Sequence, residues 1–191
     1  MSPMKKLLAI IILSLSFITL SQADNIRDFQ INGISIGSSL LSFYSKKEIK
    51  AGTTINNPYK SEEFLMITLP SSDKIYEALV FHIKKNDKNY IIHSISGQNS
   101  MSLKPCLMER EKIFKELKGL FPNTKLFNLD KRDHPGYENS YSYSSYFKFK
   151  SGDLIEIACY DFNNLLNKDS DDKLTISLDT KEFNQFLLRA Y

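Results

Sequence analysis

S-L-K-P-C-L-M-E-R-E-K-I-F-K-E-L-K-G-L-F, Ser102 to Phe121, contains the longest helical pattern that follows the N-terminal segment of this sequence. Apolar residues recur in it at intervals of three and four, which predicts an amphipathic helix with one face on a core. Pro105 suits the first turn of such a helix, and Gly119 followed by Pro122 marks its end. Strand patterns lie on both sides of the stretch, so the helix is expected to pack on a sheet.

The chain has two cysteines, Cys106 in this helix and Cys159 in a predicted strand. In an exported chain two cysteines favour one disulfide. It would close a loop of about 50 residues and stabilise the fold by about 4 kcal/mol. The alternatives are a buried free thiol and a catalytic cysteine, but no Cys-x-x-Cys motif indicates redox chemistry. We therefore predict a Cys106–Cys159 bond that joins the helix to the sheet.

The N-terminal segment, residues 1–23, has the pattern of an export signal. Lys5 and Lys6 precede an apolar run that is too short to span a membrane, and small residues before Asp24 suit cleavage after Ala23. The alternative is an uncleaved anchor. We expect a cleaved signal peptide, a periplasmic or secreted product, and no transmembrane segment after cleavage.

Composition excludes two classes of partner. Lys5 and Lys6 account for two of the three formal positive charges, so the mature chain is close to neutral. A near-neutral chain gives no basis for binding nucleic acid or an anionic membrane. Residues 24–191 suit a single domain with a real core.

Along the chain, strand patterns group into hairpins with helices around them. Strands are expected at 29–36, 64–69, 75–84, 90–96, 124–130, 140–150, 153–162 and 174–178, with helices after Ser38 or Ser39, at 102–121 and from residue 181. Antiparallel hairpins with two or three packed helices indicate an α+β fold.

One short string carries a resemblance. Gly33–Leu40, G-I-S-I-G-S-S-L, is similar to the opening of small exported bacterial proteins that have no known activity. The resemblance covers under a tenth of the mature chain and implies no function.

Three histidines offer the usual candidates for chemistry. If the first hairpin turns about Asp87–Lys88, His82 faces His93, a weak candidate pair for a metal that still lacks a third ligand. His134 with Asp133 and a nearby Ser or Tyr is the candidate cluster for a hydrolase.

Arg110 falls inside the apolar stripe of the long helix, where it either extends from the edge or meets an anion. No nucleotide-binding, Ser-hydrolase or zinc-protease motif is present, and no cofactor is expected.

The second hairpin carries an unusual number of aromatic residues. If it turns about Ser151–Gly152, Phe147 faces Glu156, and Cys159 lies on the opposite sheet face from the aromatic set. That face is either covered by another helix of the chain or is a binding surface. The candidate binding residues are Tyr141, Tyr143, Phe147, Phe149 and Tyr160.

These observations predict an exported, non-enzymatic domain that binds a protein, a peptide or an envelope component. The alternatives are a periplasmic hydrolase with a site assembled in space and a metal-binding accessory protein.

Overall fold

The computed structural model describes residues 25–54, 59–71, 75–135, 137–162 and 171–190 of the 191-residue chain. The predicted signal peptide, residues 1–23, lies outside the described residues. The helical elements are η1 (Ile26–Asp28), η2 (Leu40–Ser42), α2 (Lys46–Gly52), α3 (Leu103–Leu120) and α4 (Lys181–Leu187). The strands are β1 (Phe64–Pro70), β2 (Ala78–Lys84), β3 (Ile92–Ser100), β4 (Lys125–Asp133), β5 (Tyr141–Lys148), β6 (Leu154–Asp161) and β7 (Lys173–Asp179).

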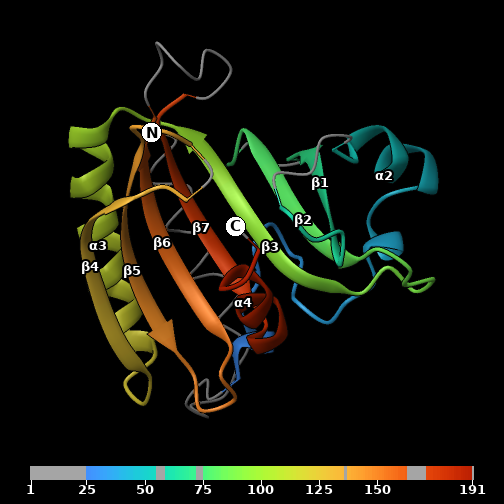
Figure 1. Cartoon of the computed structure of the whole chain (residues 1–191). Coiled ribbons are helices and arrows are strands. Elements are labelled where there is room, and N and C mark those ends of the chain that lie inside the picture. Colours follow the sequence, from blue (N-terminus) through green and yellow to red (C-terminus); the bar gives the residue numbers. More distant parts are fainter. Residues whose placement is uncertain (1–24, 55–58, 72–74, 136, 163–170, 191) are drawn as a thin grey trace.

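The strands form one seven-stranded antiparallel sheet, so the predicted α+β class is confirmed. Its order is β1-β2-β3-β7-β6-β5-β4, which means that two meanders, β1 to β3 and β4 to β7, meet where β3 pairs with β7. α3 connects the two meanders. Figure 1 shows α3 behind β5 and β6, and α4 in front of β3 and β7. We call the two sides of the sheet the α3 face and the α4 face.

The main core lies on the α3 face. Side chains alternate along a strand, and the residues of β6 and β7 that share a face with Cys159 are apolar, except Asp161 at the end of β6. α3 covers this face over β5, β6 and β7, while the segment from Ile26 to Ile49 adds buried residues to the same core. Phe29 contacts Phe121 of the helix C-cap, with ring centroids 5.6 Å apart.

Local signals mark the start of three helices, whereas the helix expected after Ser38 or Ser39 is only the short η2, whose N-cap Ser39 makes no side-chain capping bond. Pro105 lies in the first turn of α3, Ser45 and Glu48 form a capping box on α2, and the Thr180 side chain caps α4. The predicted disulfide is confirmed: Cys106 and Cys159 are bonded, with Cα atoms 5.9 Å apart. None of the helices in the described residues is long and apolar enough to cross a membrane.

The predicted strand at 29–36 is wrong. Ile31 and Ile34 form only an isolated bridge with each other, closed by Asn32 and Gly33 at positive φ. The apolar alternation there buries side chains against the α3 face without joining the sheet, because a tight turn interrupts the run.

The predicted pairing of β5 with β6 is wrong by one residue. Phe149 donates to the Asp153 carbonyl, so the loop has three residues and is closed by Gly152 at φ 93°. A two-residue turn about Ser151–Gly152 would have set Phe147 against Glu156, but Phe147 pairs with Ile155. A shift of one residue exchanges the faces of a whole strand.

The predicted His82–His93 pair is also wrong. His82 pairs with Ser94, and Ile83 pairs with Ile92. The register changes between His82 and Ile83, which leaves His93 as the extra residue of a β-bulge.

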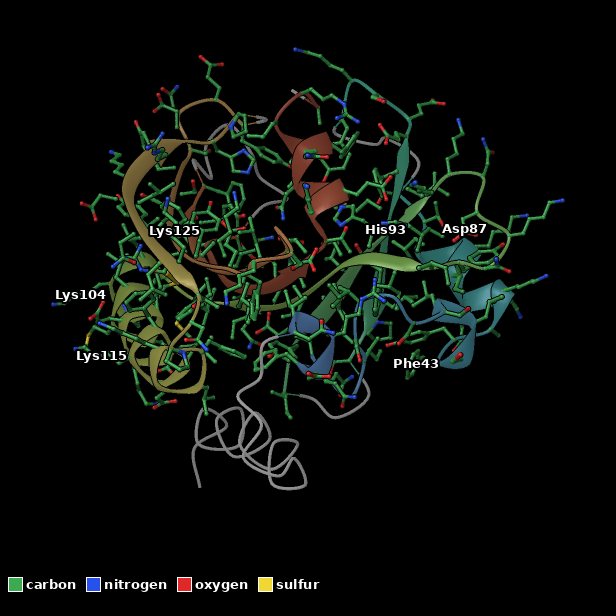
Figure 2. The ribbon with its side chains drawn as sticks, turned by 90° about the horizontal axis from the view of Figure 1, so that it is seen from below. Phe43, Asp87, His93, Lys104, Lys115 and Lys125 are labelled. Atoms are coloured by element: carbon green, nitrogen blue, oxygen red, sulfur yellow. A yellow bond between two sulfur atoms is a disulfide. The ribbon has the colours of Figure 1, made fainter. Side chains whose placement is uncertain are left out.

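A second, smaller core lies on the α4 face over β1, β2 and β3. It consists of Phe64, Phe183, Phe186 and Ala190, with Tyr59 and Leu187 packed against it. α4 therefore covers one part of the α4 face. Figure 2, seen from below, shows α3 and α4 on opposite sides of the sheet, with β4 turned toward the α4 side.

Gly97 of β3 leaves no room for a side chain on the α3 face. A Cβ atom at this position would lie 2.3 Å from the Tyr76 ring, which is itself buried. We expect Gly97→Ala to lower the free energy of unfolding by about 2 kcal/mol, because the ring must leave its position. Urea denaturation measures the effect. Gly119→Ala is the control, since its Cβ meets no atom and alanine favours the helix; an equal loss in both variants would contradict the steric explanation.

Candidate functional site

Polar side chains gather on the α4 face where β3, β7, β6 and β5 lie side by side. Ser94 pairs with Asp179, Ser96 with Ser177, and Ser177 in turn with Glu156, so these residues form rows across the strands. Tyr146 continues the second row on β5. We call this set the polar sheet face: Ser94, Ser96, Gln98, Ser144, Tyr146, Glu156, Thr175, Ser177 and Asp179.

The short side chains of the polar sheet face are buried, and the longer ones are partly exposed. The serines, Thr175 and Asp179 are buried, whereas Gln98, Tyr146 and Glu156 keep part of their surface. Figure 1 shows no helix across β5 and β6 on this side, and α4 stands beside them. The polar sheet face thus consists of buried hydroxyl groups close to the strand backbones and of longer polar side chains that reach the solvent.

Two carboxyl groups lie at its centre. Glu156 pairs with Ser177 and Asp179 pairs with Leu154, which makes the two acids diagonal neighbours on one face. Burial raises the pKa of Asp179 to about 7, a hydrogen bond from Ser94 opposes the shift, and the Glu156 charge adds to it. Burial likewise raises the pKa of Glu156, against hydrogen bonds from Ser144 and Tyr146. The pKa of the Tyr146 hydroxyl is raised by burial and by the adjacent Glu156, so it stays a hydrogen-bond donor.

Neither carboxyl forms an ion pair with a basic residue in the part of the chain that the structure describes. The ion pairs found among the described residues all involve other acids. Carboxyl groups inside proteins are normally paired, because an isolated buried charge is very costly. Unpaired acids with displaced pKa values are typical of functional sites.

Thr175 adds an unsatisfied hydroxyl beside the acids. Its side chain is 3% exposed, and its Oγ1 is a buried polar atom without a hydrogen-bond partner. Thr175 pairs with Ala158 of β6, so Glu156 is its diagonal neighbour on the same face. Ser96 and Ser177, by contrast, satisfy each other at 2.8 Å. Buried hydroxyl groups normally have a hydrogen-bond partner, and the described residues supply none for Thr175.

The sequence reasoning missed this site. The alternation of polar and apolar residues in H-S-I-S-G-Q (His93–Gln98) and L-T-I-S-L-D (Leu174–Asp179) was a usable signal, since each places small polar groups on one face. Only the pairing of β3 with β7 brings the two polar sets together.

The predicted aromatic set does not form one surface. Phe147 and Phe149 are buried in the main core, and Tyr143 packs against that core beside Cys159. Tyr160 lies on the opposite face of β6 from Cys159 and contacts His134 and Phe162. A binding role for the set stays a prediction, but two of its members are buried in the core and one lies on the other face of the sheet.

His82 and His93, the weak metal candidates, lie under α4. The His82 ring stacks on Phe183 at 4.3 Å, and its Nε2 lies 3.0 Å from the Tyr59 hydroxyl. His93 contacts Phe64, and its Nδ1 lies 3.3 Å from Glu182. Among the described residues there is no group of three His, Cys, Asp or Glu side chains that could hold a metal ion.

The suggested hydrolase cluster of His134, Asp133 and a nearby Ser or Tyr stays a prediction, and the structure places its members as follows. His134 lies among the aromatic rings of Tyr137, Tyr160 and Phe162, and burial lowers its pKa. Asp133 is exposed at the end of β4. Aromatic surroundings favour the neutral form of an imidazole.

Two other features offer no defined chemistry. An open hollow of about 640 Å³ lies along β4 between Asn128 and Asp133, with acids and bases both in its lining. Arg110 is partly exposed, and its Nε and Nη1 are buried without a hydrogen-bond partner. Neither feature brings several groups of one chemical kind together, as the polar sheet face does.

Comparisons of the chain with protein-family models, with curated proteins and with solved structures gave no match.

Proposed function

We propose that this chain is an exported, non-enzymatic binding protein and that the polar sheet face is its binding site. The observation that supports this most concerns the described residues: on one partly open face, two carboxyl groups form no ion pair with any of them, and the buried hydroxyl next to these acids has no hydrogen-bond partner among them. A bound polar ligand would supply those missing hydrogen bonds, which the free protein leaves unmade at a cost to its stability.

A hydrolase is the second candidate, because two adjacent acids of which one has a pKa of about 7 are suited to proton exchange. The hydroxyls nearest to the acids favour the binding role. Ser94 bonds to Asp179, and Ser144 bonds to Glu156, so both hydroxyls already act as donors to carboxyl groups. A nucleophilic serine requires a base that takes its proton instead.

Thr175→Val tests the binding role. Valine has the shape of threonine without the unsatisfied hydroxyl, so we expect the free protein to gain about 1 kcal/mol of stability. Ligands that use the site should bind roughly tenfold more weakly, because they lose a buried hydrogen bond. The probes are amino acids, short peptides, polyamines, monosaccharides and dicarboxylates, screened by amide chemical shifts of the labelled protein.

Ser145→Ala is the matched control. Ser145 is a buried hydroxyl residue on β5, bonded to Asn128 and located on the α3 face. We expect it to lower stability and leave ligand affinity unchanged.

The proposed function is overturned if no probe shifts the amide signals of residues 94–98, 154–158 or 175–179, or if Thr175→Val leaves the affinity for every probe unchanged. Turnover of an ester or glycoside that disappears in Asp179→Asn would favour the hydrolase.

A further inference from the structure

We propose that the polar sheet face recognises a basic side chain, the ammonium of lysine or the guanidinium of arginine, presented by a peptide or protein partner. This inference rests on the proposed function, since it names the chemistry of the ligand at the same site.

The charge balance of the site is the first argument. Glu156 and Asp179 stand on adjacent strands of one face and form no ion pair with a described basic residue. Among the described residues, no basic group of the neighbouring elements forms an ion pair with these acids. Lys84 pairs with Glu182 at 2.6 Å, and Lys173 lies over the Phe162 ring at 5.3 Å. Lys148 is a diagonal neighbour of Glu156 on the same face, but its side chain is exposed to solvent and forms no ion pair with Glu156. The two acids therefore lack an ion-pair partner within the part of the chain that the structure describes.

The number of acceptors is the second argument. Glu156 is the diagonal neighbour of Asp179 on one side and of Thr175 on the other, so three acceptor groups line up along β6 and β7. An ammonium offers three N–H donors and a guanidinium five, and both bond well to carboxyl and hydroxyl oxygens. A divalent metal ion prefers several carboxylate ligands, and the described residues offer no group of three.

The surroundings of the acids are the third argument, and they favour a peptide over a small free amine. The partly exposed Tyr146 and Gln98 stand on the two strands that flank the acids, β5 and β3. Tyrosine rings offer wide contact area with a polar tip, and amide groups pair with a peptide backbone. A small free amine would leave these groups unused, whereas a residue within a chain reaches them.

A charge series of blocked amino acids tests the inference. The probes are Nα-acetyl-lysine methylamide and Nα-acetyl-arginine methylamide, with the norleucine and citrulline derivatives as neutral partners of the same shape. Titrations are followed by amide shifts and by the side-chain carboxyl carbon signals of Glu156 and Asp179. We expect the cationic probes to bind at least tenfold more tightly than the neutral ones and to move both carboxyl signals. Glu156→Gln and Asp179→Asn should each remove that preference.

Glu116→Gln is the control, because Glu116 is an acid of α3 on the other side of the sheet. It should leave the preference unchanged. Equal binding of neutral and cationic probes overturns the cation inference, while the proposed function still stands if any ligand shifts the polar sheet face. Binding of putrescine without binding of either blocked amino acid overturns the peptide partner. Stronger shifts with Ca²⁺ or Mg²⁺ than with the cationic probes assign the acids to a metal instead and also overturn it.

Discussion

Between pH 6.5 and pH 3, the wild-type protein should lose about 5 kcal/mol of unfolding free energy through protonation of His82, and His82→Phe should abolish this loss. Burial lowers the pKa of His82 from 6.5 to about 3, and the rings of Phe183 and Tyr59 pack against the imidazole. The folded protein therefore binds the proton more weakly than the unfolded chain. Stability is complete above pH 6.5 and is lost as the pH falls toward 3.

Urea denaturation at a series of pH values measures this effect. The Phe variant loses one hydrogen bond with Tyr59, about 1 kcal/mol at neutral pH, but should show a much flatter acid limb. Tyr59→Phe is the control, since it removes the same hydrogen bond and keeps the imidazole, so the steep acid limb should remain. An unchanged acid limb in the His82 variant would show that the proton binds elsewhere.

Asp179→Asn should stabilise the protein by up to about 4 kcal/mol above pH 7 and by little near pH 4. The pKa of Asp179 is raised from 3.8 to about 7, chiefly by burial. A raised pKa in the folded state means that stability is complete below pH 3.8 and is lost as the pH rises through 7. Asparagine carries no charge at any of these pH values and can still bond to Ser94.

The pH dependence of thermal or urea unfolding between pH 4 and 9 measures the difference. Asp130→Asn is the control, because Asp130 is exposed on β4, and it should follow the wild-type curve. Two parallel curves for wild type and Asp179→Asn would mean that Asp179 is hydrated in the folded protein. The same result would weaken the case for a desolvated acid pair on the polar sheet face.

Local features were predictable because their causes lie within a few residues of each other. Helix α3 follows from its three-and-four apolar spacing, and the caps of α2 and α4 follow from Ser45 and Thr180 with the residues just after them. The disulfide was predictable because only one pairing of two cysteines exists. The α+β class followed from the alternation of strand patterns with helical ones.

The two wrong strand pairings, of β5 with β6 and of His82 with His93, have causes that the apolar pattern does not show. A three-residue loop in place of a two-residue turn moved Phe147 and Tyr143 to the core, and one bulge residue separated His82 from His93. Neither a loop length nor a bulge alters the apolar pattern on which the prediction depended. Each changes the register by one, and a change of one residue is enough to exchange faces.

The sequence by itself determined which residues alternate, where helices begin and end, and which two sulfur atoms can bond. It also determined that β3 and β7 each carry small polar groups at every second position. Only the tertiary structure decided that these two strands are neighbours, although Ser96 and Ser177 are 81 residues apart. That pairing, together with β6, places Glu156 beside Asp179. The physical reason is that alternation along a strand is a local property, which assigns each side chain to one face of the sheet. The pairing of distant strands decides which side chains become neighbours on that face and which carboxyl groups are desolvated.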